Sequence, residues 1–134
     1  MDRIVFWKEK DKQIVDPDLF SINAEAFAKK MAYDHDDSRG KLNKRTQIRK
    51  FFDEVVYLDM TAKSRPDDWP SISPLVHMMT AKAAYARGRD LVSDAFLQFI
   101  RQSVEQVDDP EDLSVFATFF EAFIGFYRLH GPSN

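Results

Sequence analysis

The sequence contains no cysteine, and among its 134 residues it has only 3 histidines, 4 glycines and 6 prolines. Without cysteine it can form neither a disulfide framework nor a cysteine-based zinc site, and it suits a reducing cytoplasm. Few glycines and prolines with 44% hydrophobic residues argue against a disordered chain. No apolar run approaches the roughly 18 residues of a membrane span, and residues 1–8 hold too short an apolar stretch for a secretory signal. We therefore expect one cytoplasmic domain over residues 1–134.

Capping signals and apolar periodicity divide most of this chain into about five helices. We expect a helical bundle over residues 23–130, so that the fold class is all-α. Residues 1–20 form an N-terminal extension, because two short apolar stretches around a charged turn favour a hairpin or an extended segment there. A hairpin of this size is marginal alone and must pack on the helices or stay loose.

Five polar residues are predicted to begin the helices as amino-terminal caps: Asn23, Asn43, Ser73, Asp90 and Asp109. Two of them directly precede a proline, which favours the first helical position. Ile22 and Phe27 flank the first cap at the positions of a hydrophobic staple. The first helix is expected to end near Tyr33 and to be followed by a loop over residues 34–40. A second long loop is expected over residues 64–73, after the second helix.

Helical spacing also predicts which side chains are buried. The second helix buries Ile48, Phe51, Phe52, Val55 and Ala62. The third helix buries Leu75, Met78, Met79, Ala83 and Ala86. The last helix is apolar on more than one face, through Phe116, Phe119, Phe120, Phe123 and Phe126. Such a helix lies at the centre of the core or buries one side in a partner, and we prefer the central position.

Residues that commonly carry catalysis are few. His35, His77 and His130 do not lie at metal-ligand spacing on one helix. Residues 34–37 contain three aspartates that could bind a divalent cation, but a solvated loop is the preferred interpretation. The sequence has no glycine-rich phosphate loop, nucleophile elbow or HExxH motif. We therefore expect no enzymatic activity, no metal site and no cofactor.

The distribution of charge is the most informative property of the chain. Residues 39–52 contain six basic residues and no acidic one. Because the whole chain carries −3, the other 120 residues carry −9. The acidic pI of 5.6 therefore conceals a basic patch, and nucleic acid stays possible as a partner.

Three of these cations, Lys41, Lys44 and Arg45, are placed at the start of the predicted second helix. The helix dipole is already positive there, so each cation should cost up to about 1 kcal/mol. An anion would remove this conflict. Free backbone amides, a dipole and basic side chains together make a phosphate site.

Farther along the same helix, Arg45 and Arg49 are four residues apart on one flank, and Lys50 projects to the far side. The simpler alternative is a solvated helix end, with ion pairs from Arg49 to Asp53 and from Lys50 to Glu54. Charge alone does not decide between a phosphate site and a solvated helix end.

A second, smaller basic group consists of Lys82, Arg87 and Arg89, around the turn between the third and fourth helices. This turn is either a helix stop followed by a cap, or it places two guanidinium groups beside the first patch. Phe51 and Phe52 lie next to the first patch but at core spacing. We interpret them as core residues rather than as base-stacking residues.

Three sequence blocks follow one another in an order typical of a known family. Residues 42–55 read LNKRTQIRKFFDEV, with Gln, an aliphatic residue, Arg, Lys, an aromatic pair, an acid and Val in succession. Residues 82–89 read Lys-x-x-Tyr-Ala-x-Gly-Arg, and residues 116–127 contain Phe-x-x-x-Phe-Glu-Ala. Together, over about residues 40–130, these blocks resemble the small subunit of the type III-A CRISPR effector, the Csm complex.

The resemblance implies an all-helical, non-catalytic, RNA-binding subunit of an antiviral ribonucleoprotein. Several copies would stack on one another and on other Csm subunits, and would contact target RNA along its duplex with the guide crRNA. Cleavage of RNA would belong to other subunits. The matched positions imply RNA contacts by Arg49, Lys50, Arg87 and Arg89. Charge and the helix dipole add Lys41, Lys44 and Arg45.

Two other classes of function stay open. A helical adaptor would bind only protein, through the Phe-rich last helix. A helix-turn-helix DNA-binding protein would use residues 46–50. The 21-residue helix and the long loop predicted after it fit the helix-turn-helix motif poorly.

Overall fold

The computed structural model of the chain describes residues 3–134, and 74% of the residues are helical. Two short strands, β1 (Trp7–Glu9) and β2 (Ile14–Val15), pair antiparallel near the amino terminus. They are followed by the helices α1 (Ala24–Asp37), α2 (Arg45–Ser64), α3 (Trp69–Gly88), α4 (Asp94–Glu105) and α5 (Pro110–His130). The prediction of an all-α bundle with a short N-terminal hairpin is confirmed.

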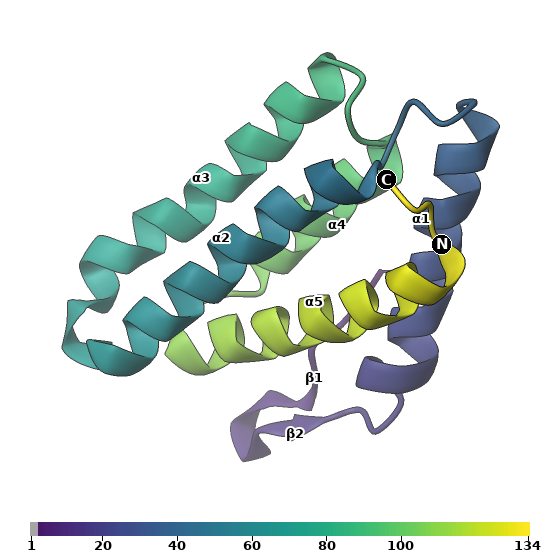
Figure 1. The fold of residues 1–134 in the computed structure, drawn as a ribbon. Helices are drawn as coiled ribbons and strands as arrows, with labels where there is room; N and C mark the ends of the chain where they lie inside the picture. Colours follow the sequence, from purple (N-terminus) through teal and green to yellow (C-terminus); the bar gives the residue numbers. More distant parts are fainter. Residues whose placement is uncertain (1–2) are drawn as a thin grey trace.

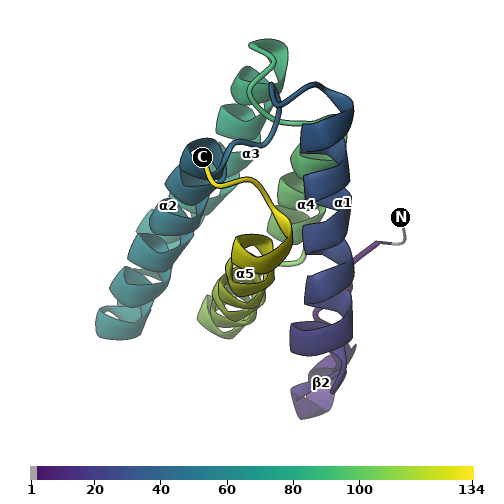
Figure 2. The same cartoon turned by 45° about the vertical axis from the view of Figure 1, so that its right-hand side comes forward.

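The last helix, α5, lies between α1 and α2 (Figures 1 and 2). Helix α3 runs antiparallel beside α2 and also packs against α4. The antiparallel α2–α3 pair differs from a helix-turn-helix, whose two helices cross at about 90–120°. After α5 the chain turns back, so that the carboxyl terminus lies at the start of α2 (Figure 2).

Phenylalanine rings fill the centre of the bundle. Phe116, Phe119, Phe120 and Phe123 of α5 are completely buried, which confirms the central position predicted for this helix. Their rings lie 4.7–6.4 Å from aromatic rings of the hairpin, α1, α2 and α4. Offset and edge-on contacts at such distances are favourable beyond the area they bury. Since the folded chain itself buries these rings, they are not available as the surface of an adaptor.

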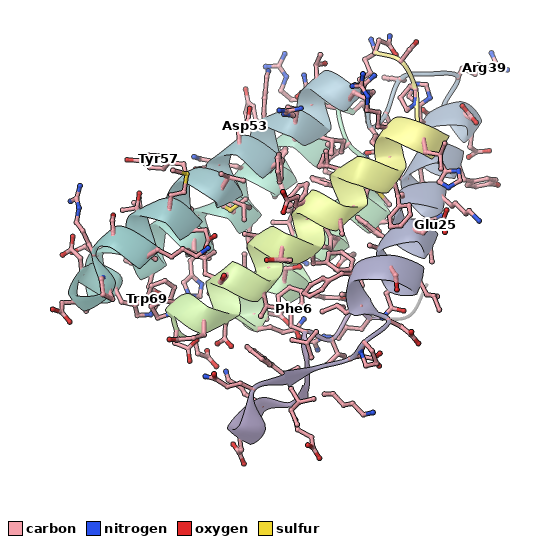
Figure 3. The ribbon with its side chains drawn as sticks, turned by 60° about the horizontal axis from the view of Figure 1, so that its bottom comes forward. Phe6, Glu25, Arg39, Asp53, Tyr57 and Trp69 are labelled. Atoms are coloured by element: carbon pink, nitrogen blue, oxygen red, sulfur yellow. The ribbon has the colours of Figure 1, made fainter. Side chains whose placement is uncertain are left out.

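The hairpin packs on the bundle. Phe6 is completely buried, and its ring stacks on Phe116 with centroids 5.8 Å apart (Figure 3). The Phe6 amide donates to Oε1 of Gln106 at 2.9 Å. Trp7 Nε1 donates to Oδ1 of Asp112 at 2.6 Å, so β1 is held by both packing and hydrogen bonds.

Helix α1 differs from its prediction at both ends. A single π-helical turn over Leu19–Asn23 leads into it, and Asn23 has helical backbone angles and no capping hydrogen bond. Ile22 is 63% exposed, so the predicted staple does not form. At the other end the helix continues through residues 34–37, which were predicted to be a loop. Lys30 pairs with Asp34 at 2.8 Å along the helix, which stabilises this last turn.

Helix α3 begins four residues before the predicted cap at Ser73. Pro70 occupies its first turn and Pro74 lies inside it. The predicted loop over residues 64–73 is therefore only Arg65 and one 3₁₀ turn, Pro66–Asp68. Trp69 Nε1 donates to the carbonyl of Asp108 at 3.1 Å, which ties the start of α3 to the segment before α5 (Figure 3).

The buried faces of α2 and α3 were predicted with unequal success. Four of the five predicted side chains of α2 are buried, and the fifth, Phe52, is half-buried. On α3 the prediction was wrong for Leu75 and Met78, which are 49% and 51% exposed. The buried stripe of α3 is Ile72, Val76, Met79, Ala83 and Ala86. Two apolar stripes run side by side on this helix, and packing against α4 selects one of them.

The last two helix starts show one wrong cap and one correct one. Asp90 has a φ of +58° in the turn after α3, and the cap of α4 is Ser93, whose Oγ accepts from the Phe96 amide at 3.4 Å. Asp109 caps α5 as predicted, accepting from the Asp112 amide at 2.8 Å. The correct cap belongs to a purely local signal, Asp followed by Pro.

Candidate nucleic-acid interface

The start of α2 is fixed in the bundle by a buried asparagine. Asn43 is completely buried and has a φ of +60°, a backbone conformation that asparagine tolerates well. Its Nδ2 donates to Oγ of Ser93 at 2.9 Å, and its Oδ1 accepts from the Ser93 amide at 2.9 Å. The Asn43 amide donates to the Leu91 carbonyl at 3.0 Å. The prediction that Asn43 caps α2 was wrong, because its side chain joins α2 to the start of α4.

Tyr127 of α5 completes this anchor. Its hydroxyl donates to the Asn43 carbonyl at 2.5 Å, and the ring is 1% exposed. Burial raises the pKa of the Tyr127 hydroxyl well above its ordinary value, so it stays a neutral hydrogen-bond donor. Hydrogen bonds within the chain therefore hold the α2 start against both α5 and the segment that begins α4.

The first turn of α2 itself carries positive charge and no compensating acid. Lys44 occupies the cap position without a capping hydrogen bond, and no acidic residue lies in the first turn. Free amides at a helix start attract anions, and the dipole adds to this attraction. Lys44 is exposed, and no ion pair among the described residues involves it.

A groove runs between the first turns of α2 and the end of α5. It has a volume of about 420 Å³ and includes Arg45, Thr46, Arg49, Lys50, Asp53, Ile124, Tyr127, Arg128, Ser133 and Asn134. Four of these side chains are basic and one is acidic. Arg45 donates to the Ser133 carbonyl at 3.3 Å, which holds the carboxyl-terminal segment over the groove. We call this hollow the α2–α5 groove.

The acid of the α2–α5 groove is paired within the helix. Arg49 Nε donates to Oδ1 of Asp53 at 3.3 Å, a pair that belonged to the alternative of a solvated helix end. Both side chains are more than 60% exposed, so this pair is weak and leaves Arg49 accessible. The Arg49 guanidinium also lies 5.8 Å from the centre of the half-buried Phe52 ring. This contact orients Arg49 along the groove.

A second groove of about 490 Å³ lies on the other side of α2, against α3. It includes Gln47, Lys50, Phe51, Glu54, Lys82, Tyr85, Ala86, Arg89 and Leu91. Glu54 pairs with Lys82 across the two helices, and the Lys50–Glu54 pair of the solvated-helix alternative does not form. Lys50 borders both grooves. We call this second hollow the α2–α3 groove.

The structure separates six of the seven predicted RNA-contact residues into two groups and leaves Lys44 apart. Arg45, Arg49, Lys50 and Arg89 border the two grooves. Lys41 and Arg87 instead share one partner, Asp90, each at 3.3 Å. Lys44 is exposed at the uncapped start of α2, between these groups.

Sequence reasoning missed two basic contributors. Arg128 is on the last turn of α5, and its side chain borders the α2–α5 groove. Lys82 was noticed as part of a small basic group but was not included among the contacts. We call the side chains of Arg45, Arg49, Lys50, Lys82, Arg89 and Arg128 the basic surface.

The histidines lie outside both grooves. His130 Nε2 is 2.7 Å from Oε2 of Glu25, and this contact joins the end of α5 to α1. The hydrogen bond from His130 lowers the pKa of the Glu25 carboxyl. His35 Nδ1 is 3.3 Å from Asp36, and His77 is exposed on α3. Within residues 3–134, no group of three or more His, Cys, Asp or Glu side chains could hold a metal ion.

A comparison with known protein families gives a match across most of the chain. The family model described as Csm2 Type III-A matches residues 18–133. The chain belongs to the Csm2 family. It is therefore a small subunit of a type III-A CRISPR complex, the Csm complex, which contains other Csm subunits.

The Csm2 match spans the five α-helices and every residue that borders the two grooves except Asn134. The hairpin of residues 7–15 lies outside it. No match was found among curated proteins or among solved structures. Within the described part of this Csm2-family chain, no helix is both long and apolar enough to span a membrane.

Proposed function

We propose that this Csm2-family chain is a non-catalytic RNA-binding subunit that holds target RNA on its basic surface. The observation that carries the proposal is the clustering of basic groups from α2, α3 and α5 around one uncapped helix start. Guanidinium groups stay charged at all working pH values, so they position phosphates and do not transfer protons. The chain would thus bind RNA in the cytoplasm and leave cleavage to other subunits.

The geometry favours contacts to the RNA backbone. Arg45, Arg49 and Arg128 converge on the α2–α5 groove, and Lys50 links this groove to the α2–α3 groove. A phosphate chain crossing the start of α2 would meet basic groups on both sides of the helix. Backbone contacts carry no base information, which suits a complex in which pairing between crRNA and target RNA reads the sequence.

A salt titration with the purified chain and single-stranded RNA tests this proposal. The logarithm of the binding constant should fall linearly with the logarithm of salt concentration. Replacing Arg49 and Lys50 together by alanine should make the slope shallower by about 0.7 for each phosphate contact that is lost. Because both side chains are exposed, the double variant should fold normally.

A matched control removes the same net charge elsewhere. Arg101 on α4 and Lys29 on α1 are exposed and border neither groove. The double variant Arg101→Ala with Lys29→Ala should keep the wild-type slope. Equal slopes in the two double variants would show that net charge matters and that the proposed contacts do not exist.

Contacts with other Csm subunits and with further copies of the chain need a different surface. Tyr57 and Met60 of α2, with Leu75 and Met78 of α3, are 49–66% exposed large apolar side chains. Exposed apolar groups of this size are typical of protein contacts. Met60→Glu combined with Met78→Glu should lower the amount of the chain recovered with the purified Csm complex, while the salt slope of RNA binding stays unchanged.

A further inference from the structure

Three tyrosines of the chain are almost equally exposed but lie in different surroundings. Tyr33 on α1 is 61% exposed, Tyr57 on α2 is 66% exposed and Tyr85 on α3 is 65% exposed. Tyr57 borders neither basic groove and lies at the outer edge of α2 (Figure 3). Only Tyr85 of the three is part of a groove lined by basic side chains.

The ring of Tyr85 is held in place within its groove. Arg89, one turn later on α3, donates from Nη1 to the Tyr85 hydroxyl at 3.0 Å. The Arg89 guanidinium carbon lies 5.7 Å from the centre of the ring. A ring fixed in this way loses little conformational entropy when a ligand stacks on it.

Charge around the ring suits a nucleotide. Lys82, Tyr85 and Arg89 are three and four residues apart and share one face of α3, and Lys50 approaches from α2. The acid of this groove, Glu54, is already paired with Lys82. An aromatic face surrounded by cations is the arrangement with which proteins bind single-stranded nucleic acids, because bases stack and phosphates pair.

Tyr33 shows that exposure and a neighbouring cation are not sufficient. Lys30 lies 5.3 Å from the centre of its ring, which resembles the Arg89–Tyr85 contact. However, Lys30 is paired with Asp34, and Asp36 and Asp37 follow on the same turn of α1. A phosphate approaching Tyr33 would meet acidic groups, so the surroundings of Tyr33 disfavour a nucleotide.

We infer that Tyr85 is a stacking platform for an unpaired base, with Lys50 and Arg89 holding the adjoining phosphates. This inference rests on the proposed RNA-binding function and adds to it that the RNA leaves one base unpaired at the α2–α3 groove. A base within a continuous duplex is stacked on its neighbours and offers no free face to Tyr85. The volume of the groove, about 490 Å³, lies in the range of small-ligand sites.

The test compares two RNA chains of equal length at one salt concentration, a uridine oligomer and the same backbone with abasic residues. Replacing Tyr85 by alanine should weaken binding of the uridine oligomer by about tenfold, the typical loss for one stacked base. Binding of the abasic chain should not change. Tyr85→Phe keeps the ring and should bind nearly as well as the wild type.

Two further readouts separate stacking from charge and from folding. The salt slope should be the same for Tyr85→Ala and the wild type, because no phosphate contact is removed. Tyr33→Ala and Tyr57→Ala, matched in exposure, should bind both oligomers like the wild type. Equal losses for the uridine and abasic chains, or no loss for either, would overturn the stacking inference.

Failure of the stacking inference and failure of the proposed function give different results. If Arg49→Ala with Lys50→Ala makes the salt slope shallower but Tyr85→Ala has no effect, the RNA surface stands and the stacking platform is wrong. If wild-type protein binds neither oligomer at low salt, both proposals are wrong.

Discussion

The starts of α5 and α2 have the same free amides and positive dipole end but carry side chains of opposite charge. At α5, Asp109 caps the helix and Glu111 and Asp112 place negative charge in its first turn. The Asp112 carboxylate is 1% exposed and accepts hydrogen bonds from Trp7, from the Asp108 amide and from Lys10. At α2, Lys44 leaves the helix uncapped, and the neighbouring charges are positive.

The contrast separates charges that hold the fold from charges that face outward. At the α5 start, the buried Asp112 carboxylate is paired with Lys10 within the chain and joins the hairpin to the bundle. The charge at the α2 start is exposed, borders two grooves and has few partners. A helix start that attracts anions and receives none from its own chain suits an external phosphate. Substitutions at the two helix starts can test this difference.

The largest effect on stability is expected at Asn43, the buried residue that holds the start of α2. Asn43→Ala removes two buried side-chain hydrogen bonds and places alanine at a φ of +60°. We expect the free energy of unfolding to fall by about 3 kcal/mol, measured by urea denaturation. Asn23, which the sequence also suggested as a cap, makes no capping bond, so Asn23→Ala should change stability by less than about 0.5 kcal/mol. Similar losses in both variants would contradict the anchoring role of Asn43.

At the α5 start, Asp112→Asn should lower the free energy of unfolding by about 2 kcal/mol. The amide cannot accept from Trp7, Lys10 and the Asp108 amide together as the carboxylate does. RNA binding by the folded variant should match the wild type, because Asp112 borders neither groove. Glu111→Gln, an exposed neighbour in the same turn, serves as the control and should change stability by less than about 0.5 kcal/mol. A loss of RNA affinity in Asp112→Asn would break the separation between the two helix starts.

A smaller, pH-dependent effect comes from the same carboxylate. Burial raises the pKa of the Asp112 carboxyl, but hydrogen bonds from Lys10, the Asp108 amide and Trp7 outweigh burial and hold it below the ordinary value of 3.8. The stabilisation is therefore present above about pH 3.8 and is lost as the pH falls through the lower pKa of the folded state.

The neighbouring cap acts in the opposite direction. Burial raises the pKa of the Asp109 carboxyl, so its contribution to stability decreases as the pH rises through that raised pKa. Denaturation measured below about pH 3.8 should show stability falling with pH in the wild type and falling less in Asp112→Asn. An equal acid loss in both proteins would assign the titration to other carboxylates.

The smallest effect on stability is expected from making the α2 start resemble the α5 start. Thr46→Glu introduces an acid into the exposed first turn of α2 and should stabilise the protein by about 0.5 kcal/mol through the dipole. The same carboxylate borders the α2–α5 groove, so RNA affinity at low salt should fall by about fivefold. Ser71→Glu makes the same charge change in the exposed first turn of α3 and should leave RNA affinity unchanged. Gains in stability without a loss of affinity would show that the α2 start does not bind phosphate.

Local signals in the sequence predicted a helix start correctly where interactions within one turn determine it. Asp109 followed by Pro110 begins α5 as predicted, since both the cap and the fixed φ of proline act within one turn. Ser73 followed by Pro74 gives the same signal and fails. Trp69 anchors the chain four residues earlier, and α3 forms across the second proline. The difference is a contact with a residue about forty positions away.

In the candidate site, too, some residues could be predicted from the sequence and others could not. The basic residues of α2 could be found from the sequence, because a charge run and a helix dipole are both local properties. Arg128 could not be assigned to the same groove, since it is about 80 positions away and only the packing of α5 beside α2 brings it there. Lys41 and Arg87 were expected to contact RNA, but the turn after α3 brings Asp90 to both of them.

The sequence by itself determined the all-α fold class, the Phe-rich core of α5, the basic character of the α2 start and the family resemblance. These follow from periodicity, composition and short motifs, which depend on neighbours within a few turns. Three other features depend on tertiary packing. Asn43 is a buried anchor, and α3 buries Ile72 and Val76 but exposes Leu75. Tyr85 lies in one groove with Lys50. The physical reason is that these choices depend on which helices pack together, and several sequence-compatible faces compete until packing selects one.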